Sequence, residues 1–179
     1  PEMSRGLGDV YKRQEYKQVY SPDHPVPYAE LLNEQTEPVM RELHERGVKC
    51  AIASSSYREL IDELVEIASE TVDCAKIFGI DPKVAFLSYS TKGSGKGDTV
   101  DKMRNACAKA KAAAPELAIE GEMQFDAAVS PTVGQLKFPG SPVAGYANTF
   151  IFPDINAGNI GYKIAQRLGK FDAYGPILL

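Results

Sequence analysis

The sequence contains no tryptophan, only three cysteines and only two histidines. Cys50, Cys74 and Cys107 are odd in number and far apart, so they predict neither a disulfide framework nor a zinc site. Cys50 and His44 could formally pair as nucleophile and base, but Cys50 sits in the apolar stretch VKCAIAS, where cysteine is usually a small buried filler. We therefore predict structural cysteines and no bound metal.

Long apolar runs and an excess of basic charge are also absent. There is no run of 18 apolar residues and no basic amino-terminal region followed by an apolar core, so neither a membrane span nor a secretory signal is predicted. With 20 basic and 24 acidic residues the net charge is −4, which provides no basic stripe for a phosphate backbone. We expect a cytoplasmic protein with no nucleic-acid partner and no membrane partner.

Short apolar stretches alternate with helical patterns along most of the chain. Strand patterns occupy 48–54, 83–90, a segment near 117–121, and 148–153. Apolar residues at helical spacing predict helices over 28–46, 57–78, 98–114 (opened by Asp98) and 159–168, and QFDAAVSPTVGQLK predicts helical stretches broken at Pro131. This alternation predicts an α/β fold, with a mostly parallel sheet covered by helices on both faces.

The stretch STKGSGKG, residues 90–97, lies between a predicted strand and a predicted helix. Such a loop can present backbone N–H groups to an anion, because a helix begins with unpaired donors and partial positive charge. It is not a Walker A motif, since Ser90 and Gly97 stand where that motif requires glycine and a hydroxyl. Composition alone favours phosphate contact and a plain connection equally. The candidate binding residues of this loop are Ser90, Thr91, Lys92, Gly93 and Ser94.

A second polar loop, PDINAGN (153–159), follows the strand pattern NTFIFP. Pro153 should end the strand, and Asp154 or Asn156 can cap the helix that follows. A capped helix explains most of this composition, but its place at the carboxyl end of a strand is where open α/β sheets bind ligands. We predict that both loops open onto the same edge of the sheet, and the candidates here are Asp154, Asn156, Asn159 and Lys163.

Three acidic residues alternate near the centre of the chain: Glu120, Glu122 and Asp126. Paired carboxylates can act as general acid and base, but nothing in the sequence supplies a raised pKa or a substrate. We predict a solvated strand edge or a helix cap for these side chains.

Residues from about 64 to 179 resemble the phosphate acetyltransferase family through "IFGIDPKVAFLSYSTKGSGKGDTVDKMRNA", "EGEMQFDAAVSP", "VAGYANTFIFPDINAGNIGYKIAQRLG" and "AYGPIL". The resemblance implies a three-layer αβα fold like that of isocitrate and isopropylmalate dehydrogenases, with the 90–97 loop facing a cleft between domains. It also implies acetyl transfer between coenzyme A and inorganic phosphate. Acetyl-CoA and phosphate would be substrates, no cofactor would be permanently bound, and the intact family is expected to form homodimers.

The resemblance implies that the family's catalytic serine–arginine pair and nearby aspartate lie downstream of its "AYGPIL" segment, and the given sequence stops at Leu179, one residue after that segment. No catalytic residue is therefore assigned within this chain by the resemblance. We expect the 179-residue polypeptide to be inactive alone.

The stretch 28–58, with "ELHERGVKCAIASSS", resembles instead part of a haloacid-dehalogenase-like phosphatase or phosphomutase, in which Ser54 would contact the phosphoryl group. The DxD motif of that family is missing. The predicted organisation is a disordered tail or artefact at 1–14, a haloacid-dehalogenase-like fragment at 15–63 and a phosphate acetyltransferase fragment at 64–179. The phosphatase and a non-catalytic α/β fragment are the alternative interpretations.

Overall fold

The computed structural model of the chain describes residues 36–49, 52–54 and 61–173. The predicted tail at 1–14, Cys50 and the first part of the predicted helix at 28–46 lie outside these residues. The described strands are β1 (Ile52–Ser54), β2 (Lys83–Leu87), β3 (Ala118–Met123) and β4 (Thr149–Ile151). They form one sheet in the order β1-β4-β2-β3, and each neighbouring pair is parallel.

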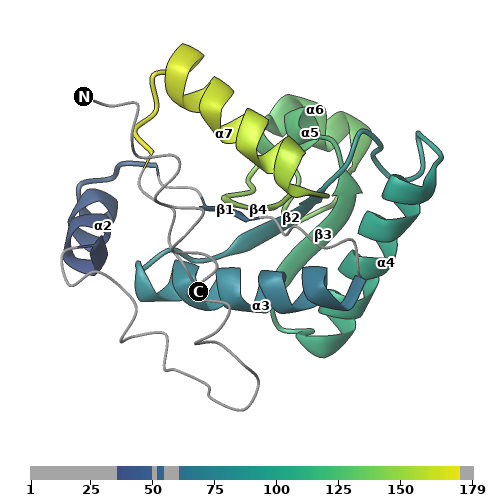
Figure 1. Cartoon of the computed structure of the whole chain (residues 1–179), viewed down its shortest axis with the longest axis horizontal. Coiled ribbons are helices and arrows are strands. Elements are labelled where there is room, and N and C mark those ends of the chain that lie inside the picture. The colour runs from purple at the N-terminus through teal and green to yellow at the C-terminus, as the bar shows by residue number, and fades with distance from the viewer. Residues whose placement is uncertain (1–35, 50–51, 55–60, 174–179) are drawn as a thin grey trace.

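Helices cover both faces of this sheet, as Figure 1 shows. Helix α3 runs along one face beside α4, while α5, α6 and α7 lie on the other. The described helices are α2 (Thr36–Glu45), α3 (Ile61–Ile77), α4 (Asp98–Ala113), α5 (Phe125–Val129), α6 (Pro131–Lys137) and α7 (Ile155–Leu168). The predicted α/β fold with a parallel sheet covered on both faces is confirmed.

Strand β2 lies inside the sheet and contributes to a separate apolar core on each face. Val84 and Phe86 pack with α3 and α4, whereas Ala85 and Leu87 face the opposite side. Successive side chains of a strand point to opposite faces, so a strand buried on both faces reads as a continuous apolar run. The first core also contains Leu64, Ala68, Val72, Met103, Ala106, Cys107, Ala110, Ile119 and Ile151, and the second contains Met123, Ala128, Phe138, Val143, Ala144 and Phe150.

Several helix ends follow the local sequence signals. Gly79 adopts φ of 76° just beyond α3, a left-handed conformation that glycine tolerates at a helix end. Ser130 ends α5 and caps α6, with Pro131 as the first residue of α6, so the predicted break is confirmed. Helix α4 begins at Asp98, as predicted, and Gly97 occupies the cap position before it.

The last helix differs from its prediction in two respects. It begins at Ile155, four residues earlier than expected, because Asp154 accepts a hydrogen bond from the backbone N–H of Ala157 and caps it there. Its predicted apolar face is largely uncovered, and more than half of the surface of Ile160, Ile164 and Leu168 is exposed. No helix in the described ranges is both long enough and apolar enough to cross a membrane.

Candidate functional site

Two polar loops lie at the same edge of the sheet. One follows β2 and leads into α4, and the other follows β4 and leads into α7. Because β2 and β4 are neighbouring parallel strands, both loops lie at their carboxyl ends, so the prediction of a shared edge is confirmed. A direct contact joins the helix that follows the first loop to the second loop, since the Lys102 ammonium of α4 donates a hydrogen bond to the carbonyl oxygen of Pro153 at 2.7 Å. Ser54, the last residue of β1, also lies at this edge.

The glycine-rich loop is closed by hydrogen bonds within itself. The Tyr89 hydroxyl donates to the carbonyl oxygen of Lys96 at 2.8 Å, and the N–H of Thr91 donates to Ser94 Oγ at 2.9 Å. The N–H of Gly95 donates to Ser90 Oγ at 3.0 Å. These contacts give the loop a defined shape without a ligand.

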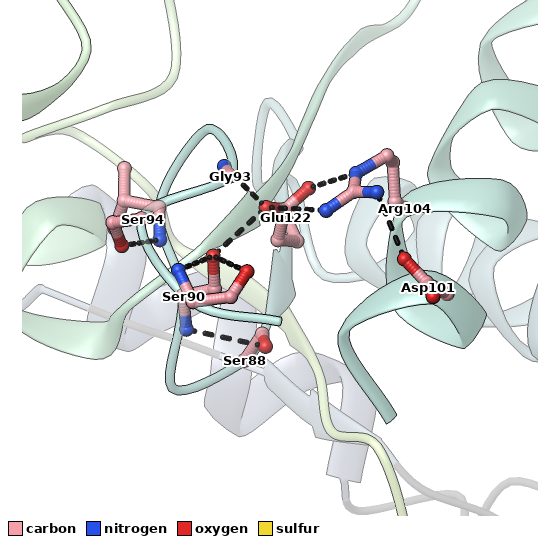
Figure 2. A network of polar contacts seen from close by, with 9 residues as sticks. Ser88, Ser90, Gly93, Ser94, Asp101, Arg104 and Glu122 are labelled. Atoms are coloured by element: carbon pink, nitrogen blue, oxygen red, sulfur yellow. Dashed lines mark hydrogen bonds and ion pairs between the residues drawn. The ribbon is translucent and has the colours of Figure 1, made fainter. Parts of the chain in front are cut away.

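The inner side of this loop contacts the carboxylate of Glu122, as Figure 2 shows. Oε1 of Glu122 accepts hydrogen bonds from Ser90 Oγ at 3.0 Å and from the N–H of Gly93 at 2.7 Å, while Oε2 accepts from Arg104 Nε at 3.1 Å. The Glu122 side chain is only 2% exposed. The donors that were candidates for a bound anion therefore already contact an anion of the protein itself.

These contacts determine the charge state of Glu122. Burial would raise the pKa of its carboxyl group, because the charged form loses hydration. Hydrogen bonds from Arg104, Gly93 and Ser90 outweigh burial and hold that pKa below its usual range. Glu122 is thus a buried carboxylate at neutral pH.

The prediction of a solvated position for Glu122 is wrong, and the pairing of β3 explains why. Phe86 pairs with Gly121 and Leu87 with Met123, so Glu122 is an extra residue where the register shifts. Such a bulge redirects a side chain. Glu120, from the same strand, is partly exposed and pairs with Lys111 at 3.1 Å. Asp126 is about half exposed at the start of α5, so both of these side chains reach solvent, as predicted.

The residues predicted from the first loop fall into two groups. Ser90 and Thr91 are buried, and Thr91 Oγ1 accepts a hydrogen bond from the N–H of Gln124 at 2.9 Å. Lys92, Gly93 and Ser94 are exposed, although the Gly93 N–H is already bound to Glu122. Lys92 adopts φ of 51°, and its Nζ lies 4.4 Å from the centre of the Phe138 ring. Any substrate contact by these residues stays a prediction.

The second loop contributes one cap and two exposed polar side chains, and α7 contributes a third beyond the loop. Asp154 caps α7, as described above. Asn156, Asn159 and Lys163 are exposed, and Lys163 Nζ lies 4.9 Å from the centre of the Tyr162 ring. Within the part of the chain that the structure describes, the Asn156 and Asn159 side chains make no hydrogen bond. They are therefore available to a ligand at this edge, and their binding role stays a prediction.

Sequence reasoning missed Arg104 and Lys102 at this edge and assigned Glu122 a solvated position instead of a place in the site. Arg104 and Lys102 lie on the helix that directly follows the glycine-rich loop, so their proximity to it could have been expected from chain order. Their partners could not, because Glu122 and Pro153 come from distant segments. The structure thus adds two cations and one buried anion to the predicted set.

The profile of the family described as phosphate acetyl/butaryl transferase matches residues 54–179, which is more than half of the chain. The chain belongs to this family. Among curated members of the phosphate acetyl/butaryl transferase family, it is 57% identical over 116 residues to a phosphate acetyltransferase of Bacillus subtilis (strain 168), which covers 65% of this chain and 36% of the relative. It is 51% identical over 141 residues to a phosphate acetyltransferase of Thermoanaerobacterium thermosaccharolyticum, which covers 76% of this chain and 42% of the relative.

A solved structure of the family agrees with the fold. The crystal structure of a phosphotransacetylase from Streptococcus pyogenes superposes with a TM-score of 0.66 at 58% sequence identity. The superposition covers 68% of this chain and 37% of the other. The chain thus spans well under half the length of the curated relatives and of the phosphotransacetylase that it matches.

Proposed function

We propose that this chain is part of a phosphate acetyltransferase, which moves an acetyl group between coenzyme A and inorganic phosphate. The observation that carries the proposal is the 57% identity over 116 residues with the phosphate acetyltransferase of Bacillus subtilis. Acetyl-CoA and phosphate are then the substrates, and no permanently bound cofactor is required. The protein would act in the cytoplasm, and a homodimer is the expected assembly of the intact enzyme.

The carboxyl edge of the sheet suits substrates of this kind. Both coenzyme A and inorganic phosphate are anionic. This edge presents the exposed ammonium group of Lys92 and the ammonium of Lys102 on α4, and Lys163 is exposed further along α7. The amides of Asn156 and Asn159 add hydrogen-bond donors. We assign substrate contact to Lys92, Ser94, Asn156, Asn159 and Lys163.

The remaining predicted residues are assigned a supporting role. Ser90, Thr91 and Gly93 form the interior of the first loop, and Asp154 begins α7. Their hydrogen bonds stay inside the protein, so they would set the shape of the edge rather than bind substrate.

A segment exchange tests the assignment. The part of the Bacillus subtilis enzyme that matches this chain would be replaced by this chain's own residues, and CoA release from acetyl-CoA would be measured with phosphate present. We expect turnover in the ordinary range for enzymes, about 1 to 1,000 per second. The purified 179-residue polypeptide serves as the second arm and should show no measurable turnover, because the family's serine–arginine pair lies downstream of "AYGPIL".

The outcomes of the exchange separate the alternatives. A hybrid that folds and binds coenzyme A but transfers nothing would overturn the acetyltransferase assignment for this segment. Substantial turnover by the 179-residue polypeptide alone would show that its own residues suffice for catalysis. Hydrolysis of a phosphate monoester by the polypeptide would favour the haloacid-dehalogenase-like alternative.

We also propose the division of the chain into 1–14, 15–63 and 64–179, with a junction between the two resemblances near 58–66. Two observations constrain it. Strand β1 lies upstream of the proposed junction, yet it pairs with β4, which lies downstream of it. The family match begins at Ser54, inside the segment assigned to the haloacid-dehalogenase-like fragment. Sequencing the locus across the junction tests the division, since an upstream frame encoding a DxD motif would support it and one encoding more of the acetyltransferase family would overturn it.

A further inference from the structure

We propose that Glu122 is a positioning residue: its buried carboxylate holds the 90–97 loop in shape and thereby fixes the ammonium of Lys92 at the carboxyl edge of the sheet. The inference rests on the proposed function only for the statement that Lys92 faces substrate. Its structural part, that Glu122 determines where Lys92 lies, stands on the contacts alone.

Glu122 holds the backbone on both sides of the Lys92 side chain. The N–H of Lys92 donates to the carbonyl oxygen of Glu122 at 3.2 Å, and the N–H of the next residue, Gly93, donates to its carboxylate at 2.7 Å. Both Lys92 and Gly93 have positive φ, of 51° and 80°. A non-glycine residue adopts this conformation at a cost and keeps it only where its surroundings hold it there. The two hydrogen bonds to Glu122 supply that restraint.

The carboxylate is itself held from a third element. Arg104 of α4 donates to it through Nε at 3.1 Å, and Arg104 also donates to Asp101 at 2.9 Å. A buried charge is tolerated only when it is paired and hydrogen-bonded, and here the pairing joins β3, α4 and the loop. The Glu122 side chain of β3 therefore links the loop to α4 (Figure 2).

The consequence for Lys92 is a fixed place above an aromatic ring. Its Nζ lies 4.4 Å from the centre of the Phe138 ring, within the range of a cation–π contact. Phe138 is buried at the end of α6, so the ring does not move with the loop. If Glu122 releases the loop, Lys92 should leave the ring while the ring stays in place.

The test reads this displacement directly, in the full 179-residue chain labelled with ¹³C and ¹⁵N. A ring face shifts nearby protons upfield, so the CεH₂ protons of Lys92 should resonate upfield of those of an exposed lysine. In Glu122→Ala we expect this signal to move to the exposed-lysine position. We also expect the Gly93 amide to exchange with solvent about tenfold faster or more, as for a lost hydrogen bond to a charged group.

The chain offers matched controls. Glu120→Ala removes a carboxylate two residues away on the same strand that contacts Lys111 and not the loop, so it should leave Lys92 and Gly93 unchanged. Lys83 Nζ lies 5.8 Å from the centre of the Tyr146 ring and Lys163 Nζ lies 4.9 Å from that of Tyr162, and the signals of these two lysines should not move in either variant. A general loss of structure would move all three lysines, which separates positioning from stability.

The result that overturns the proposal is a folded Glu122→Ala chain in which Lys92 stays above the ring. If that variant does not fold, Glu122→Leu, with a side chain of similar size, decides. Leucine has no acceptor for Gly93, Ser90 or Arg104, so all three contacts of the carboxylate are lost and the Gly93 amide should exchange severalfold faster. Unchanged exchange and an unmoved Lys92 signal would then overturn the proposal. None of these readings depends on turnover, so a failure here is distinct from a failure of the acetyltransferase assignment.

Discussion

Lys102 and Pro153 link α4 to the second loop of the carboxyl edge, because the ammonium on α4 donates to the carbonyl oxygen just before the cap of α7, at 2.7 Å. The two residues are 51 positions apart in the sequence. Helix α4 is anchored in the core by Met103, Ala106 and Ala110, so its first turns form a firm support. The start of α7 is thereby tied to the rigid part of the molecule, although little of α7 is itself buried.

Replacement of Lys102 by methionine should loosen that link at a small cost in stability. The variant loses one hydrogen bond from a charged donor that is partly exposed, so we expect the free energy of unfolding to fall by about 1 kcal/mol. Amides in the first turn of α7 should also exchange faster. Lys109→Met is the control, since Lys109 makes only an exposed ion pair with Asp62 and should cost less than about 0.5 kcal/mol in urea unfolding. An equal loss in the free energy of unfolding in the two variants would contradict a stabilising hydrogen bond between Lys102 and Pro153.

Two helical glycines should differ in how far the free energy of unfolding falls when each is replaced by alanine. A Cβ on Gly134 of α6 would lie 2.6 Å from the backbone nitrogen of Gly145 and 2.9 Å from the carbonyl oxygen of Ala127, and backbone cannot yield easily. We expect Gly134→Ala to lower the free energy of unfolding by about 2 to 3 kcal/mol, as overpacking does. A Cβ on Gly161 would meet only the edge of the Phe152 ring at 3.2 Å.

Gly161→Ala is therefore the matched control for the same substitution in a helix. Alanine favours the helical conformation over glycine by up to about 1 kcal/mol, which offsets a small shift of the ring. We expect this variant to stay within about 1 kcal/mol of the parent chain in the same urea titration. If Gly134→Ala lowered the free energy of unfolding no more than Gly161→Ala does, then α6 would not pack as closely on the 143–145 turn as the distances indicate.

The two described cysteines should be unreactive in the native chain. Burial raises the pKa of the Cys74 thiol to about 11 and that of Cys107 to about 12, because the thiolate loses hydration. At pH 8 only about one thiol in a thousand or fewer is ionised, and the thiolate is the reactive form. Alkylation with iodoacetamide, read by peptide mass spectrometry, should modify neither residue until guanidinium is added. Native-state labelling of Cys107 would contradict its buried position.

The general architecture could be predicted because its signals are local. The run KVAFL reads as a strand buried on both faces, and β2 has that environment. Pro131 breaks the helical stretch, since the residue before it caps a new helix. The shared edge of the two loops then follows from parallel pairing, which leaves few ways to connect strands and helices.

The interior of the site could not be predicted, because it depends on one extra residue in a strand. The alternation of side chains along a strand would place Glu120 and Glu122 on the same face. The register shift in β3 instead leaves Glu122 without a partner residue on β2 and buries its side chain, while the Glu120 side chain stays partly exposed. Spacing cannot reveal such a shift, as it depends on the partner strand. In the same way the sequence identified Ser90 and Thr91 as polar, but only their tertiary partners show that both hydroxyls point inward.

The stability of the chain should depend on the ionisation of Glu122 in acid. Hydrogen bonds from Arg104, Gly93 and Ser90 outweigh burial and depress the pKa of this carboxyl in the folded state, whereas an unfolded glutamate titrates near about 4.3. A depressed pKa means that the contribution to stability is present in full above the unfolded pKa. It is lost as pH falls below about 4.3 and through the folded pKa, because only the unfolded state then gains the proton readily.

Comparison of the parent chain with Glu122→Gln measures this contribution. At pH 7 we expect the variant to be less stable by about 2 to 3 kcal/mol, since removing one partner leaves donors of a buried network unpaired. The difference should narrow steadily between pH 5 and pH 3, because Glu122 gains a proton in the unfolded parent chain before it does in the folded one, which lowers the stability of the parent and leaves that of the glutamine variant unaffected at this position. Asp126→Asn is the control: the pKa of Asp126 is also depressed, chiefly by a hydrogen bond from Lys137, but that side chain is about half exposed and solvent screens the interaction. A gap between parent and Glu122→Gln that stays constant down to pH 3 would show that the charge of Glu122, as opposed to its shape, contributes nothing to the fold.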